Sequence, residues 1–135
     1  MFQYTTCCRT ILADLYTPVG VYMRLRDLHP QSALMESSDY HGNDNSRSFI
    51  GINPIGCVAI GHGKAVCHMP DGSTMESEVN VGHSTEQVIN DFLSRISITG
   101  SRADVCGLYG YTSFNAVRYF ENIPVKDCTM EKNDA

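Results

Sequence analysis

Glu36 and Ser37 place a carboxylate and a hydroxyl at the end of an apolar stretch, where a core residue is expected. A buried carboxylate is costly unless a cation or hydrogen-bond donors meet it. The partner is either an internal arginine or the ammonium group of a ligand, and such a charge-assisted contact contributes roughly 1.5–3 kcal/mol net. Arg47, beyond a loop of Gly, Asn, Asp and Ser, can bind a ligand carboxylate or pair with Glu36. Spacing alone does not separate these alternatives.

The other candidates for chemistry in the sequence are weak. No serine stands in a nucleophile elbow, and no two carboxylates have the spacing of an acid/base pair. The run 107–110 (GLYG) lacks both common phosphate-loop signatures. His62, Cys67 and His68 match no standard spacing of zinc ligands. We therefore expect no catalytic residue, no metal site and no cofactor in this chain.

Length and composition predict a single globular domain over residues 1–135. The chain is 42% apolar and 19% charged, with a net charge of -5, which argues against nucleic acid or an anionic membrane as the partner. The first ten residues do not form a secretory signal, and no apolar run is long enough to span a bilayer. We expect a cytoplasmic location, where the six cysteines are free thiols rather than a disulfide framework.

The hydrophobic pattern predicts an α+β fold, with an antiparallel meander of strands and three packed helices. The first helix begins at Thr17-Pro18 and stops at His29-Pro30, and the second begins with a capping box at Ser84 and ends at Gly100. The third spans residues 113–121. The expected strands are residues 32–38, 48–53, 55–60, 64–69, 74–81 and 105–112.

Four segments together resemble the N-terminal region of anthranilate synthase component I, a chorismate-utilising enzyme family. Residues 17–26 (TPVGVYMRLR) resemble its opening helix, and residues 34–37 (LMES) its L-L-E-S motif. Residues 48–51 (SFIG) and 107–121 (GLYGYTSFNAVRYFE) resemble its S-F-I-G strand and its G-L-x-G-Y segment. Their order and spacing agree across nearly the whole chain. The resemblance implies the N-terminal part of that family's sandwich fold.

The resemblance also implies a regulatory role in tryptophan biosynthesis. Component I makes anthranilate from chorismate, with Mg²⁺ at the active site and ammonia supplied by a glutamine amidotransferase, component II. Its N-terminal region carries much of the tryptophan feedback site. By this resemblance Met35, Glu36 and Ser37 hold the ammonium group of L-tryptophan, and Arg47 belongs to the same pocket.

The family's chorismate- and Mg²⁺-binding residues lie in a C-terminal region that residues 1–135 do not include. We therefore expect that this chain is not catalytic alone, although it resembles part of a lyase. Unpaired strand edges are expected to allow self-association. Two alternatives remain open: a stand-alone amino-acid-binding or subunit-interaction domain, and the N-terminal part of aminodeoxychorismate synthase component I.

Overall fold

The computed structural model describes residues 1–36, 47–80 and 82–121, which fall into two compact units. One unit combines Met1–Cys8 with the described residues from Ile55 onward, and the other is Arg9–Pro54. Each unit is described by itself below. The expectation that residues 1–135 form a single domain stays a prediction.

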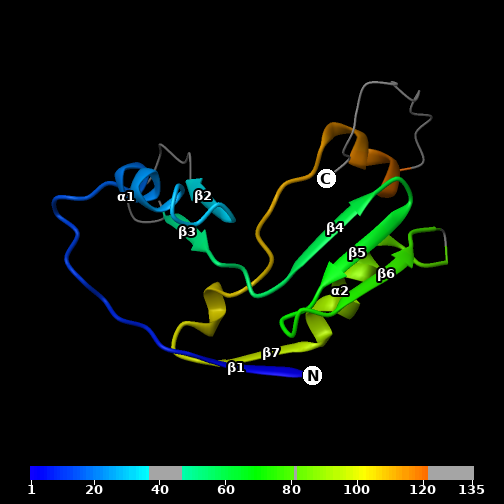
Figure 1. Cartoon of the computed structure of the whole chain (residues 1–135), viewed down its shortest axis with the longest axis horizontal. Coiled ribbons are helices and arrows are strands. Elements are labelled where there is room, and N and C mark those ends of the chain that lie inside the picture. Colours follow the sequence, from blue (N-terminus) through cyan, green and yellow to red (C-terminus); the bar gives the residue numbers. More distant parts are fainter. Residues whose placement is uncertain (37–46, 81, 122–135) are drawn as a thin grey trace. The chain divides into compact units, whose positions relative to one another are not determined.

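The unit Arg9–Pro54 consists of helix α1 (Pro18–Leu25) and the antiparallel pair β2 (Ser32–Glu36) and β3 (Ser48–Ile52) (Figure 1). Thr17 caps the helix, because its side-chain oxygen accepts a hydrogen bond from the backbone N–H of Gly20 at 3.1 Å. The predicted start of the helix is confirmed. The helix ends at Leu25, earlier than His29-Pro30, and a turn fills the interval. Residues 37–46, where the first expected strand ends and its loop follows, lie outside the described residues.

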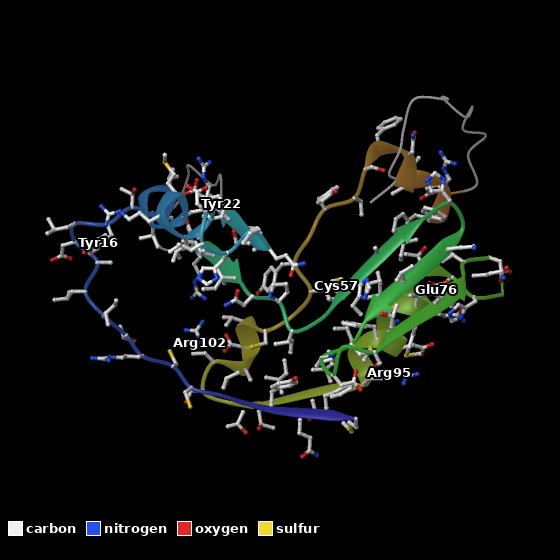
Figure 2. All side chains as sticks on the ribbon, in the orientation of Figure 1. Tyr16, Tyr22, Cys57, Glu76, Arg95 and Arg102 are labelled. Carbon is white, nitrogen blue, oxygen red and sulfur yellow. The ribbon has the colours of Figure 1, made fainter. Side chains whose placement is uncertain are left out.

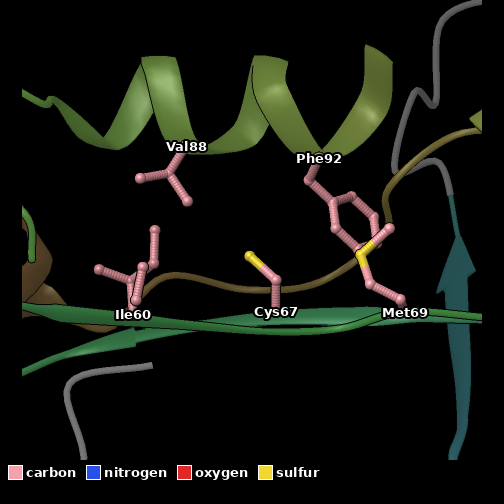
Figure 3. Close-up of a cluster of buried hydrophobic side chains, with 6 residues drawn as sticks. Ile60, Cys67, Met69, Val88 and Phe92 are labelled. Carbon is pink, nitrogen blue, oxygen red and sulfur yellow. The ribbon is translucent and has the colours of Figure 1, made fainter. Parts of the chain in front are cut away.

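The other unit is built on an antiparallel meander of β4 (Cys57–Gly61), β5 (Lys64–His68) and β6 (Thr74–Glu78). Helix α2 (Thr85–Ser94) covers one face of this sheet (Figure 1). The hydrophobic side chains between sheet and helix are the buried cluster of the unit (Figure 3): Ile60, Ala65, Cys67, Met69, Val88 and Phe92. The opposite face of the sheet carries polar and apolar side chains together: Lys64, His68, Thr74, Glu76 and Glu78 with Cys57, Ala59 and Val66.

The expected second helix is correct at its start and wrong at its end. Ser84 and Gln87 form the predicted capping box, with both reciprocal hydrogen bonds present. The helix stops at Ser94, and β7 (Ile96–Gly100) follows. β-branched residues dominate β7, and the strand pairs in parallel with β1 (Phe2–Thr6), which the hydrophobic pattern did not predict.

Two further expectations in the C-terminal third are wrong. The expected strand over residues 105–112 is absent: Ala103–Val105 is a 3₁₀ turn, η1, and residues 106–112 have no regular structure. Glycines at 107 and 110 weaken a strand because they have no side chain to pack. The expected third helix is a 3₁₀ segment, η2 (Phe114–Tyr119). Phe114, placed on its apolar side, is 88% exposed.

The α+β class is confirmed, but the strands do not form one continuous meander. The described residues form separate sheets in the orders β1-β7, β2-β3 and β4-β5-β6. The sandwich implied by the resemblance stays a prediction. Within the described residues, no helix is both long and apolar enough to cross a membrane.

Gly100 offers a direct test of the β1–β7 pair. Its φ is +102°, and a Cβ atom added there would lie 2.4 Å from the carbonyl oxygen of Thr6. We expect Gly100→Ala to lower the free energy of unfolding by about 1–3 kcal/mol, since the strained backbone and the clash act together. Urea denaturation followed by circular dichroism measures this change. Gly51→Ala, where no atom lies within 4 Å, is the matched control. Equal stability of the two variants would contradict the pairing.

Candidate functional site

A groove of about 330 Å³ lies in the unit Arg9–Pro54, between the start of α1 and strand β3. Its volume is at the low end of the roughly 300–1,000 Å³ typical of small-molecule sites. The lining is mainly apolar and comes from the segment before the helix, the first turns of the helix and alternate residues of β3: Ala13, Tyr16, Thr17, Pro18, Val21, Ser48 and Ile50.

Short-range interactions hold the wall of the groove in place. The backbone N–H of Tyr16 donates to the carbonyl oxygen of Ala13 at 2.9 Å, which closes a turn just before the helix cap at Thr17. The guanidinium carbon of Arg24 lies 6.0 Å from the centre of the Tyr16 ring. Figure 2 shows Tyr16 immediately ahead of α1. The Tyr16 side chain therefore lines the groove together with the apolar side chains of Val21 and Ile50.

The strand register places Glu36 on the groove side of the β2–β3 pair. Glu36 lies directly opposite Ser48, and Leu34 lies opposite Ile50. Residues directly opposite each other in an antiparallel pair share one face of the sheet. Because Ser48 and Ile50 line the groove, Glu36 belongs to the face of the strand pair that carries the groove, next to Ser48, although the groove itself is lined by β3 and not by β2.

The structure separates the other expected site residues. Met35 is half-buried and lies opposite Phe49, so it belongs to the face that points away from the groove. Arg47 is exposed and directly precedes β3. Ser37 lies outside the described residues. The assignment of Met35, Glu36, Ser37 and Arg47 to an effector site stays a prediction.

Glu36 does not occupy the core position that its apolar neighbours suggested. The side chain is exposed at the end of β2, and the described residues include no ion pair between Glu36 and Arg47. Within that part of the chain, an internal arginine is therefore not the partner of this carboxylate. The carboxylate is available to a cationic group from solution.

An apolar groove with an exposed carboxylate on the same face of the strand pair is suited to a ligand that joins an ammonium group to an apolar body. The carboxylate accepts charge-assisted hydrogen bonds, and the Tyr16 ring offers a surface for an aromatic side chain. Tyr16, Ser48 and Ile50 were missed as site residues from the sequence. The signal available was alternation: Ser48 and Ile50 share one side of β3.

The described residues offer no group of three His, Cys, Asp or Glu side chains that could hold a metal ion. His68 and Cys67 are consecutive in β5 and therefore point to opposite faces of the sheet. His62 lies in the turn between β4 and β5. This separation argues against a metal site built from these three residues.

The chain is similar to anthranilate synthase component 1 of Pseudomonas putida, with 34% identity over 115 residues. The matched residues are 84% of this chain and 23% of that protein, so the chain spans about a quarter of the relative's length. No family model and no solved structure matches the chain. The similarity supports a distant relation to part of that enzyme.

If Glu36 serves a ligand rather than the fold, its charge is dispensable for stability. We expect Glu36→Gln to change the free energy of unfolding by no more than about 0.5 kcal/mol, as is usual for an exposed side chain without a special contact. Urea denaturation of the two proteins, without ligand, gives the difference. A loss above about 1 kcal/mol would reveal a structural partner for the carboxylate instead.

Proposed function

We propose that this chain is the regulatory, tryptophan-binding portion of an anthranilate synthase component I. The observation that carries the proposal is the register that sets Glu36 directly opposite Ser48, a groove residue, on the strand whose sequence resembles the family's L-L-E-S motif. The similarity to the Pseudomonas putida enzyme over 84% of the chain supports the same assignment.

In this proposal each site residue has a separate role. The Glu36 carboxylate accepts hydrogen bonds from the ammonium group of L-tryptophan, and Ser37 adds one further hydrogen bond. The indole ring occupies the apolar groove beside Tyr16 and Ile50. Arg47, exposed next to β3, binds the carboxylate of the amino acid. Met35, which precedes Glu36 on β2, remains part of the proposed effector site, although its side chain lies on the opposite face of the strand.

The proposed role is regulatory because the chemistry of the enzyme is assigned to another region. The relative extends well beyond the matched part, since the alignment covers only 23% of it. The proposal places the chorismate- and Mg²⁺-binding residues in that other region, together with the reaction that uses ammonia from the component II amidotransferase. Feedback inhibition then requires that tryptophan at Glu36 changes the catalytic region.

Binding of L-tryptophan tests the proposal directly. We expect that L-tryptophan binds to the chain and that Glu36→Gln weakens this binding roughly 10- to 100-fold, the loss expected for one charge-assisted hydrogen-bonded contact. Titration calorimetry at low salt measures both affinities. Arg47→Ala is expected to weaken binding as well, because it removes the partner of the ligand's carboxylate.

Glu76→Gln is the matched control, since Glu76 is also an exposed strand carboxylate but belongs to β6 in the other unit. Its affinity for L-tryptophan should equal that of the unaltered chain. Equal weakening by Glu36→Gln and Glu76→Gln would show a general charge effect, and the site assignment would then be wrong. A chain that does not bind L-tryptophan would also contradict the proposal.

The same proposal predicts no catalysis by this chain alone. Incubation with chorismate, ammonia and Mg²⁺ should form no anthranilate above the rate without protein. The fluorescence of anthranilate provides a sensitive readout. Turnover that increases with protein concentration would place catalytic residues within residues 1–135 and overturn the division of roles.

A subunit-interaction role is the second candidate, and exposed aromatic side chains favour it. Tyr111 is 79% exposed and Phe114 is 88% exposed, within a segment that includes Tyr109 and Phe120. Contiguous exposed apolar surface commonly marks a contact with another protein or another part of the same protein. This role is compatible with amino-acid binding in the other unit.

A further inference from the structure

Three sulfur-containing side chains line the pocket between the meander and helix α2, far from Glu36 in the sequence. Cys67 lies on β5 directly opposite Met75 on β6. Met69 is two residues beyond Cys67 and belongs to the same buried cluster. All three side chains line one pocket of about 200 Å³, and its wall also includes His83. Figure 3 shows Cys67 and Met69 pointing from the sheet toward α2.

Strand pairing and a local turn position the side chains that could bind a metal ion. Directly opposite residues of an antiparallel pair have Cβ atoms about 4.5–5.5 Å apart, which lets two sulfur atoms approach one ion. Asn80 holds the turn that carries His83: its side-chain oxygen accepts hydrogen bonds from the backbone N–H groups of Gly82 at 2.9 Å and of His83 at 3.0 Å. An imidazole therefore stands at the rim of a sulfur-lined pocket.

We propose that this pocket is a binding site for a soft monovalent metal ion of the Cu(I) or Ag(I) type, held by Cys67, Met69 and Met75 with His83 at the rim. Thiolate and thioether sulfur are the ligands that such ions prefer. On binding, the Cys67 thiol releases its proton to solvent and the sulfur forms the bond to the metal, with no change of oxidation state.

The ligand types favour a soft monovalent ion, because two of the three sulfur ligands are neutral thioethers. One thiolate and one monovalent cation are together neutral, so the complex adds no net charge to the pocket. Arg95 also lines the pocket. Asp91 and Glu76 complete the charged rim (Glu76 and Arg95 are labelled in Figure 2).

A metal ion that binds Cys67 must displace the proton of its thiol. Burial raises the pKa of this thiol, with a smaller upward contribution from Cys57 and an opposing one from Arg95. The ordinary alternative is packing alone, because free cysteine and methionine both fill gaps in cores as hydrophobic side chains. Substitutions that keep the volume but remove the sulfur distinguish the two.

The test uses the full chain with the other five cysteines replaced by serine, so that Cys67 is the single thiol: Cys7, Cys8, Cys57, Cys106 and Cys128 are changed. Ag(I) serves as a diamagnetic probe. We expect one Ag(I) per chain and shifts of the methyl resonances of Met69 and Met75. The methyl resonances of Met1, Met23, Met35 and Met130 should not move.

Affinity for Cu(I) is then measured without oxygen, in competition with a chromophoric chelator. Met75→Leu keeps the volume and removes the thioether, and it should weaken binding at least tenfold with unchanged thermal stability. Met23→Leu, in the other unit, is the control and should have no effect. Cys67→Ser should abolish binding. Because Met75 is 40% exposed, its variant tests the site even if Cys67→Ser fails to fold.

Two results would overturn the proposal. Unmoved methyl resonances of Met69 and Met75 at one equivalent of Ag(I) would show that these thioethers are not ligands. Equal Cu(I) affinity of Met75→Leu and its parent would assign the sulfur atoms to packing alone. Neither result bears on Glu36 or tryptophan, because the sulfur-lined pocket and the groove belong to different units.

Discussion

The packing of helix α2 against the β4–β5–β6 sheet is the interaction on which the rest of the structure depends. Val88 and Phe92 are each only 3% exposed, and they pack against Ile60, Cys67 and Met69 on the sheet. No other described part of the chain has a buried hydrophobic cluster of this size. A capping box starts the helix at the point where its apolar face must meet the sheet. Local sequence and burial therefore favour the same arrangement.

The unit Arg9–Pro54 differs from the other unit because it buries few hydrophobic side chains and has a groove at its surface. Its helix has no fully buried residue, and its paired strands expose a carboxylate at one end. The result is a groove with mainly apolar walls, and Glu36 is exposed on the same face of the strand pair. A surface of this kind contributes little to stability, and it is the surface to which our proposal assigns an amino-acid ligand.

Local signals in the sequence were sufficient wherever a short motif determines the backbone. The cap at Thr17, the capping box at Ser84 and the turn around His62-Gly63 all lie where the sequence predicts them. One prediction failed because pairing joins distant segments. The strand Ile96–Gly100 was read as the end of a helix because its partner, Phe2–Thr6, is about ninety residues away in the chain. Helical spacing and strand alternation cannot be distinguished over so few apolar residues.

The candidate site could be predicted only in part, because it depends on how β2 and β3 are paired. Glu36 was identified from its position after an apolar run, but its exposure depends on the register of β2 against β3. That register also assigns Met35 to the far face and brings Ser48 to the side of the groove. A one-residue slip would reverse every one of these assignments. Tyr16 joins the site through a local turn, closed by the hydrogen bond from its N–H to the carbonyl oxygen of Ala13, that the sequence analysis did not predict.

The central claim is that the Glu36 carboxylate holds the ammonium group of an aromatic amino acid. Comparing L-tryptophan with 3-indolepropionic acid tests it most directly, since the second molecule keeps the indole ring and the carboxylate but has no ammonium group. In amide chemical-shift mapping, L-tryptophan should perturb Glu36, Ser48 and Tyr16 at concentrations roughly 10- to 100-fold below those that 3-indolepropionic acid requires, because the second molecule loses only the contact of the ammonium group with Glu36. Equal perturbation of these residues by both molecules would show that the ammonium group is not recognised, and would contradict the account.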